Sequence, residues 1–280
     1  VEGTDVILSC IVDGEPTPTI SWTMAGSPLN TSGNSRISFT DSNSQLTISR
    51  VDRTDSGEYQ CVAKNSRGSV SSNVTALNVH YQPAITLNPL NTTQAEGKNV
   101  TLSCNATGNP EPTISWIFNG SRIGTNYNPK IVFSKDKWKV TITNVSRRDS
   151  GEYQCLASNK IGNASSQATL DVKYIPGITA HPQNETRKEG DSANFICNAK
   201  GNPVPKISWN KGSSPLSINS RVSLSADNKN LTITNVNRVD SGAYRCVATN
   251  SLGNDTSNPA YLGVLCKYNI LITLSRNILL

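Results

Sequence analysis

The cysteines of this chain are the residues whose side chains could take part in the most kinds of chemistry. Seven of them occur among 280 residues, beside two histidines and one methionine. Two histidines at unrelated positions nearly exclude a His-rich metal centre and leave little for acid–base catalysis. The sequence also lacks a Cys-x-x-Cys pair, a Gly-rich phosphate loop and a zinc-protease helix motif. We therefore expect a protein that is not an enzyme and holds no cofactor or metal, and whose cysteines have a structural role.

Six of the seven cysteines recur with a regular period. Cys10, Cys104 and Cys197 are 94 and 93 residues apart, and a tryptophan follows each of them by twelve residues. These tryptophans are Trp22, Trp116 and Trp209. Three further cysteines, Cys61, Cys155 and Cys246, each have a tyrosine two residues before them, namely Tyr59, Tyr153 and Tyr244. A unit of about 93 residues has the size of a domain and is too long for a solenoid repeat. The sequence thus predicts domains at residues 1–80, 81–174 and 175–266, with a tail, residues 267–280, left unassigned.

Each unit has the sequence pattern of an antiparallel sheet protein. Apolar and polar residues alternate in Val6-x-Leu8-x-Cys10 and again in Leu46-x-Ile48. Alternation with period two buries one face of a strand and leaves the other in water. Turns rich in Pro and Gly separate these runs, for example Gly14-Glu15-Pro16-Thr17-Pro18. Many short strands with regular turn signals favour a β-sandwich.

The order Cys…Trp…Tyr-x-Cys, present three times, resembles the signature of immunoglobulin domains of the I-set or C2-like kind. Residues 55–61, Asp-Ser-Gly-Glu-Tyr-Gln-Cys, are similar to the tyrosine corner of that family, and so are residues 149–155 and 240–246. The resemblance covers about residues 1–265. It implies an all-β protein of three tandem immunoglobulin-like β-sandwiches. We expect them to form an extended rod, because no Gly/Ser linker separates the domains. The resemblance also implies three disulfides: Cys10–Cys61, Cys104–Cys155 and Cys197–Cys246.

The resemblance further implies a scaffold role for one acidic residue in each domain. Asp55, Asp149 and Asp240 should pair with Arg36, Lys130 and Arg221, and each corner tyrosine should bond backbone a few residues upstream. By the same alignment, domain 1 lacks a first strand. Only Val1 precedes Glu2-Gly3, whereas thirteen residues, Pro83 to Ala95, precede Glu96-Gly97 in domain 2.

Paired cysteines indicate an oxidising compartment, so we expect an extracellular protein, either a cell-surface ectodomain or a secreted matrix component. The chain begins at Val1 without Met, has no leader and has no run of 18 apolar residues. We therefore expect an internal piece of a longer protein, without a membrane span of its own. Eleven Asn-x-Ser/Thr sequons agree with an extracellular glycoprotein and are candidate glycosylation sites: Asn30, Asn73, Asn91, Asn99, Asn105, Asn119, Asn144, Asn163, Asn184, Asn230 and Asn254.

Charge restricts the classes of partner. The net charge of +6 arises from 26 basic and 20 acidic residues, yet residues 1–80 carry 5 basic and 8 acidic residues. No basic stripe of the kind that binds nucleic acid is present. One basic segment has a functional interpretation as a site for sulfated glycosaminoglycan or another acidic partner, and it comprises Lys135, Lys137, Lys139, Arg147 and Arg148. The alternative is an ordinary solvated strand face whose lysines protect a sheet edge.

The leading functional interpretation is an extracellular cell-adhesion or recognition segment that binds other extracellular or cell-surface proteins, homophilically or heterophilically. It follows from the resemblance to ectodomains of neural-type adhesion molecules and to hemicentin-like matrix proteins. Two alternatives stay open: a structural matrix spacer, and the ligand-binding ectodomain of a receptor kinase or phosphatase. The fold by itself does not choose between them. We expect the tail after the odd cysteine, Cys266, to have no stable fold and to contribute nothing to binding.

Overall fold

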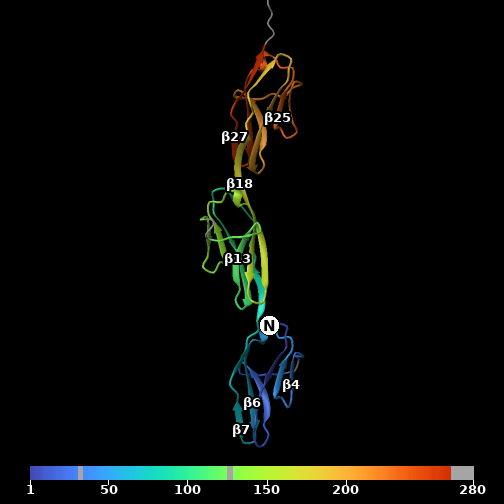
Figure 1. Cartoon of the computed structure of the whole chain (residues 1–280), viewed down its shortest axis with the longest axis vertical. Helices are drawn as coiled ribbons and strands as arrows, with labels where there is room; N and C mark the ends of the chain where they lie inside the picture. The colour runs from blue at the N-terminus through green and yellow to red at the C-terminus, as the bar shows by residue number, and fades with distance from the viewer. Residues whose placement is uncertain (31–33, 125–128, 266–280) are drawn as a thin grey trace, which may run out of the picture. The chain divides into compact units, whose positions relative to one another are not determined.

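The computed structural model describes residues 1–30, 34–124 and 129–265, and these residues form short β-strands joined by turns (Figure 1). Each of the three repeats folds as a β-sandwich, which confirms the predicted fold class. The helices among the described residues are single-turn 3-10 segments, and none of them is long or apolar enough to cross a membrane. Cys266 and the tail, residues 267–280, lie outside the described residues.

Domain 1 has two sheets. One has the strand order β1-β5-β4, and the other has the order β3-β2-β6-β7 with β8 also paired to β6. The alternation in the sequence sets the register, because Val6 opposes Ile48 and Leu8 opposes Leu46, and all four side chains pack in the core. The elements are β1 Val6–Ser9, β2 Thr19–Met24, β3 Ser27–Pro28, β4 Ile37–Thr40, β5 Gln45–Ile48, η1 Arg53–Asp55, β6 Gly57–Asn65, β7 Gly68–Ser71 and β8 Thr75–Leu77.

Domain 2 repeats this plan and adds an opening segment. Its sheets have the strand orders β11-β16-β15 and β10-β18-β17-β13-β14, and β9 pairs with β12. Val100 opposes Ile142 and Leu102 opposes Val140, and all four are buried. The elements are β9 Tyr81–Leu87, β10 Thr92–Ala95, β11 Val100–Ser103, β12 Asn105–Asn109, β13 Thr113–Phe118, β14 Ser121–Arg122, β15 Ile131–Phe133, β16 Lys139–Ile142, η2 Arg147–Asp149, β17 Gly151–Ser158 and β18 Asn163–Ala180.

Domain 3 has the sheets β20-β25-β24 and β19-β28-β26-β22-β23, with β27 on β26. The second part of β18 pairs with β21 and supplies the opening strand of this domain. Phe195 stacks on Tyr244 with 5.0 Å between ring centroids at the centre of the core. The elements are β19 Glu185–Lys188, β20 Ala193–Ile196, β21 Asn198–Asn202, β22 Lys206–Lys211, β23 Ser214–Pro215, β24 Val222–Leu224, β25 Asn230–Ile233, η3 Arg238–Asp240, β26 Gly242–Asn250, β27 Gly253–Thr256 and β28 Ala260–Leu265.

The Pro-rich turn and the Asn-Gly turn of each domain are joined by one asparagine. The side-chain amides of Asn65, Asn159 and Asn250 donate to the carbonyl oxygens of Pro16, Pro110 and Pro203 at 2.9, 2.9 and 3.0 Å. In domains 2 and 3 the same amide also donates to the carbonyl oxygen of a tyrosine, Tyr81 or Tyr174. These two loops are therefore held together by the same asparagine side chain in every repeat.

Domain 1 differs from the other two domains in how its core is covered. Among the described residues, no strand lies against residues 11–15 or along the outer edge of β8. A hollow of about 650 Å³ opens there, with Ile7, Ile11, Trp22, Tyr59, Val70 and the disulfide Cys10–Cys61 among its lining. We call this hollow the domain 1 slot. Ile11 is 99% exposed and Val70 is 68% exposed, so apolar side chains that a covering strand would shield are in contact with water.

We expect domain 1 to be the least stable of the three domains. Each apolar side chain that stays in water forgoes about 1.5–3 kcal/mol of stability. For a domain of this size, each kcal/mol lost lowers the melting temperature by roughly 4–8 °C. Hydrogen exchange on the full chain, followed during heating, should show the amides of β2 and β6 losing protection before those of β13 and β17. If the amides of domain 1 kept their protection longest, the exposed slot would not lower the stability of this domain.

Candidate functional site

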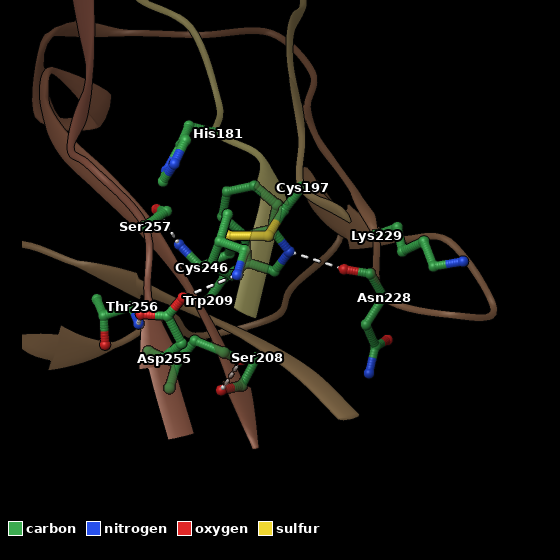
Figure 2. The surroundings of a disulfide bond; sticks show 12 residues. His181, Cys197, Ser208, Trp209, Asn228, Lys229, Cys246, Asp255, Thr256 and Ser257 are labelled. Carbon is green, nitrogen blue, oxygen red and sulfur yellow. Dashed lines mark hydrogen bonds between the residues drawn. A yellow bond between two sulfur atoms is a disulfide. The ribbon is translucent and has the colours of Figure 1, made fainter. Parts of the chain in front are cut away.

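The centre of each sandwich is a disulfide with a tryptophan beside it, and Figure 2 shows the example in domain 3. The structure contains the three disulfides that the resemblance implied. In domain 3 the indole Nε1 of Trp209 donates to the carbonyl oxygen of Asn228 at 2.8 Å. Trp22 and Trp116 make the same bond to the carbonyl oxygens of Asn43 and Lys137. Each tryptophan therefore fixes a turn on the opposite sheet as well as filling the core.

The base of the sandwich holds the expected ion pairs in domains 1 and 3. Arg36 lies 2.6 Å from Asp55, and Arg221 lies 2.8 Å from Asp240. The pairing of Lys130 with Asp149 stays a prediction. In domain 3 the hydroxyl of Tyr244 donates to the carbonyl oxygen of Asp240 at 2.7 Å. Burial raises the pKa of Tyr244 to about 12, so this hydroxyl keeps its proton and remains a donor at neutral pH.

The basic segment of domain 2 is less regular than the sequence suggested. The strand expected there is short, because β16 begins only at Lys139; Lys135 and Lys137 lie in the turn after β15, and Lys137 has φ of +62°. The three lysines are nevertheless exposed, while Val140 is buried and Trp138 is half-buried. Hydrogen bonds from the Ser134 hydroxyl and the Trp138 amide hold the pKa of Asp136 below its usual range, so one carboxylate offsets part of this charge.

Arg147 and Arg148 do not extend this basic segment, because they lie in η2, beyond the other end of β16 in the chain. Arg147 is also engaged already. Its guanidinium lies 3.7 Å from the Glu96 carboxylate and 4.6 Å from the centroid of the Tyr174 ring. Arg53 in domain 1 makes the matching contacts with Glu2 and Tyr81. This repeated Glu–Arg–Tyr arrangement indicates a structural role for Arg147.

Most of the candidate glycosylation sites are accessible. Ten of the eleven sequon asparagines are exposed, and Asn105 alone is half-buried. The side-chain oxygen of Asn105 also accepts a hydrogen bond from the Ala106 amide at 2.7 Å. Successive residues of a strand face opposite sides, so Asn230, next to the buried Leu231, should face outward, and it is exposed. Asn105 follows the buried Cys104 and should also face outward, but alternation does not show how closely other segments pack around it.

We expect Asn105 to carry less glycan than exposed sequons in the same domain when the chain is secreted from animal cells. A glycosyltransferase must reach the side-chain amide nitrogen, and partial burial hinders that approach. Peptide mapping with and without glycosidase treatment would measure the occupancy at each asparagine. Asn163, an exposed sequon of domain 2, is the matched comparison. Equal occupancy at Asn105 and Asn163 would show that the partial burial has no effect.

The described side chains form no cluster of metal ligands. Within residues 1–30, 34–124 and 129–265, no group of three or more His, Cys, Asp or Glu side chains is placed to hold a metal ion. Six cysteines are committed to disulfides.

Comparison with known families agrees with the geometry. The sequence model of the immunoglobulin I-set domain matches residues 1–79, 83–172 and 176–260. The chain belongs to the immunoglobulin I-set family. Its disulfides, core tryptophans and tyrosine corners are thus the framework of three I-set domains in series.

The relatives of these I-set domains include a peroxidasin homolog and a neural cell adhesion molecule. The chain is 37% identical over 255 residues to the human peroxidasin homolog, and the aligned region covers 90% of this chain and 17% of the relative. It is 32% identical over 285 residues to human neural cell adhesion molecule 1, and the aligned region covers 94% of this chain and 33% of the relative. The chain therefore spans between about a sixth and a third of the length of these relatives. The similarity to the peroxidasin homolog is confined to that fraction of the relative.

Solved structures of tandem immunoglobulin domains match the described fold. A variant of the titin fragment I67–I69 superposes with a TM-score of 0.66 at 25% identity, covering 95% of this chain and 94% of the fragment. A chain from the complex of Dpr2 Ig1–Ig2 with DIP-Theta Ig1–Ig3 gives a TM-score of 0.67 at 27% identity, covering 94% and 95%.

The sequence predicted that domain 1 lacks a first strand, but it did not indicate the apolar surface around Ile11 and Val70 that is exposed in the structure. Aligning the opening segments of domains 2 and 3, residues 83–95 and 176–188, would have revealed a shared pattern and the positions it covers.

Proposed function

We propose that these I-set domains form an extracellular recognition segment that binds other proteins of the cell surface or matrix, as in cell adhesion. The observation that supports this most is the combination of three disulfide-clamped I-set sandwiches with 32% identity to a neural cell adhesion molecule over 94% of the chain. A structural match to a Dpr2–DIP-Theta complex supports protein binding by the same kind of array. Binding would be passive, through strand faces and turns held rigid by the cores.

The proposed compartment is extracellular, on a cell surface or in secreted matrix. Disulfides persist in oxidising compartments, and the chain places one in every domain. The ten exposed sequons suit a secreted glycoprotein.

A binding screen would test the recognition function directly. The full chain, displayed as a pentamer to raise avidity, is tested against a panel of cell-surface and matrix ectodomains that includes the chain itself. We expect saturable binding to at least one ectodomain, or self-association if recognition is homophilic. Titin fragment I67–I69, displayed in the same way, is the control for non-specific binding by I-set domains. Binding no stronger than that control would favour a structural spacer.

The basic segment supports a second, narrower activity, which is binding of sulfated glycosaminoglycan. Lys135, Lys137 and Lys139 are exposed within five residues of chain, whereas the corresponding positions of domain 3 are Ala226, Asn228 and Asn230. Clustered cations attract sulfate groups, and the attraction weakens as salt screens it.

We expect the triple variant Lys135→Ser/Lys137→Asn/Lys139→Gln to elute from a heparin column at clearly lower salt than the unmodified chain. Asparagine is chosen at position 137 because it tolerates positive φ. A control variant, Lys64→Ser/Lys160→Ser/Lys206→Ser, removes three exposed lysines from three different domains and the same total charge. Equal elution of the two variants would mean that heparin responds to net charge alone and that the turn is an ordinary solvated surface.

A further inference from the structure

Domain 3 contains a groove of about 370 Å³ beside its corner tyrosine, Tyr244. Its lining comes from the end of β22, from β23, from the turn that leads into β24, and from η3. Sites for small ligands measure about 300–1,000 Å³, so this groove is at the lower end of that range. It therefore suits a small group, such as a side chain, and we call it the domain 3 groove.

The lining of the groove has a net positive charge. It contains two cations, Lys211 and Arg221, and one carboxylate, Asp240. Arg221 lies 2.8 Å from Asp240, so these two charges offset each other. The Lys211 ammonium donates to the Val239 carbonyl oxygen and lies 5.8 Å from the centroid of the Tyr244 ring. Burial raises the pKa of Tyr244 to about 12, so this side chain is neutral. The charge that is left without a carboxylate in the lining is that of Lys211.

Apolar side chains stand beside this charge. Val239 is 74% exposed, Pro215 is exposed and Leu216 is half-buried, and all three line the groove. A cleft with apolar walls concentrates the field of the charges that it holds, because water screens them less there. The groove therefore offers an ammonium donor together with apolar contact area, and this combination suits a carboxylate that has an apolar group next to it.

The lysine is a feature of domain 3. The residue paired with the corner tyrosine is Met24 in domain 1, Phe118 in domain 2 and Lys211 in domain 3. The ring centroid of Phe118 lies 4.7 Å from that of Tyr153, so an apolar ring covers the corner tyrosine of domain 2. Met24 likewise packs against the core of domain 1. The I-set framework thus forms with an apolar residue at this position and does not require a cation there.

The exposed valine is also specific to domain 3. The middle residue of the 3-10 turn is Thr54 in domain 1, Arg148 in domain 2 and Val239 in domain 3. Domain 3 therefore has a cation where the other domains have an apolar residue, and an apolar residue where they have a polar one. Asn219, which also lines the groove, is not part of an Asn-x-Ser/Thr sequon, so we expect no N-glycan to be attached inside it.

We propose that the domain 3 groove is a site at which a partner protein inserts an acidic side chain that is flanked by an apolar one. This inference rests on the proposed recognition function and names the chemistry of one of its contacts. The partner's carboxylate would accept a charge-assisted hydrogen bond from the Lys211 ammonium. The apolar neighbour would cover Val239. A few side chains that fill pockets of this kind supply most of the affinity of a protein interface.

A peptide titration tests the groove without knowledge of the partner. The probe is acetyl-Leu-Glu-Leu-amide, and its neutral counterpart acetyl-Leu-Gln-Leu-amide is the control. Amide NMR spectra of the full chain at low salt, where screening is weak, should show shifts concentrated at Lys211, Arg221 and Val239. The glutamine peptide should bind about fivefold more weakly, because it lacks the charge. Absence of these shifts, or equal affinity for both peptides, would overturn the proposal.

Matched variants test the roles of the two side chains. Lys211→Met introduces the residue of domain 1 and should weaken binding of the glutamate peptide about fivefold. Lys206→Met removes the same charge at the other end of β22, outside the groove, and should bind as the unmodified chain does. Equal affinities of these two variants would contradict the proposal. Hydrogen exchange of β22 and β26 shows whether each variant keeps its fold. If Lys211→Met loses protection, the exposed position decides: Val239→Gln should weaken binding about twofold, and no weakening would overturn the assignment.

The ectodomain screen separates this proposal from the recognition function. A partner found there should bind the Lys211→Met chain about fivefold more weakly than the Lys206→Met chain. Equal binding would leave the recognition function standing and overturn the groove as its site. If the screen finds no partner, the recognition function fails, and the peptide titration still decides about the groove. If glucuronic acid shifts the groove amides and the glutamate peptide does not, the occupant is a glycan and the protein partner proposed here is wrong.

Discussion

Replacing Trp209 by alanine should lower the free energy of unfolding of domain 3 by about 3–5 kcal/mol. Trp209 is 3% exposed and packs in the same core as the Cys197–Cys246 disulfide. Its ring centroid lies 6.4 Å from that of Phe195, and its indole donates to the Asn228 carbonyl. Alanine would leave a cavity that the disulfide and the two sheets prevent from closing. It would also remove the bond that holds the turn before β25.

Two matched variants separate these contributions. Trp209→Phe keeps most of the ring volume and loses the bond to Asn228, so its loss should be the smaller one, about 1–2 kcal/mol. Trp138→Ala removes an indole that is only half-buried in domain 2 and should destabilise that domain less. Hydrogen exchange on the full chain, evaluated domain by domain, measures all three. If domain 3 were as stable in the Trp209→Ala chain as in the Trp209→Phe chain, the ring of Trp209 would not be what stabilises this core.

The parts of this fold that the sequence predicted are those encoded by local periodicity and by the repeat. Alternation in Val6-x-Leu8 and Leu46-x-Ile48 predicted which side chains face the core, because successive residues of a strand face opposite sides. The threefold recurrence of cysteine and tryptophan located the cores. The pairs Arg36–Asp55 and Arg221–Asp240 came from the family resemblance and are present in the structure.

The parts that escaped prediction depend on contacts between segments distant in sequence. Parity indicated that Asn105 faces outward, but whether its amide is accessible depends on the packing around it. The bond between His181 and Asn258 joins residues 77 apart, and no periodicity announces it. The exposure of Val70 likewise depends on whether a segment distant in sequence packs over it. For the candidate sites, the sequence identified the basic segment, but it could not show that Arg147 is held by Glu96 and Tyr174.

Replacing Asp240 by alanine is the second change that we expect to be severe, at about 2–4 kcal/mol for domain 3. The Asp240 carboxylate is buried and accepts from the Arg221 guanidinium at 2.8 Å and from the Asn237 amide at 2.8 Å. Removing one partner of a largely buried pair leaves the other charge without compensation. Arg221 retains some exposure to water, so we place the loss below that of a fully buried pair.

The neighbouring Arg238 offers a control from the same 3-10 turn. Its guanidinium lies 3.4 Å from the Glu189 carboxylate, and its side chain is 70% exposed. An exposed pair of this kind contributes about 0–1 kcal/mol, so Arg238→Ala should change the stability of domain 3 little. Comparable losses for Arg238→Ala and Asp240→Ala would show that burial is not what makes the Arg221–Asp240 pair important.

The same carboxylate should make domain 3 sensitive to acid. Burial raises the pKa of Asp240, but the hydrogen bonds from Arg221 and the Asn237 amide outweigh it and hold the pKa below its usual range. The unfolded chain, with an aspartate pKa of about 3.9, then binds this proton more readily than the folded chain. The contribution of Asp240 is therefore complete above about pH 4 and is lost as the pH falls through the folded-state pKa. Asp240→Asn removes this titration, so the difference in unfolding free energy between the unmodified chain and this variant should shrink as the pH falls below about 4. A difference that stayed constant from pH 6 to pH 2.5 would mean that the charge of Asp240 does not stabilise the corner.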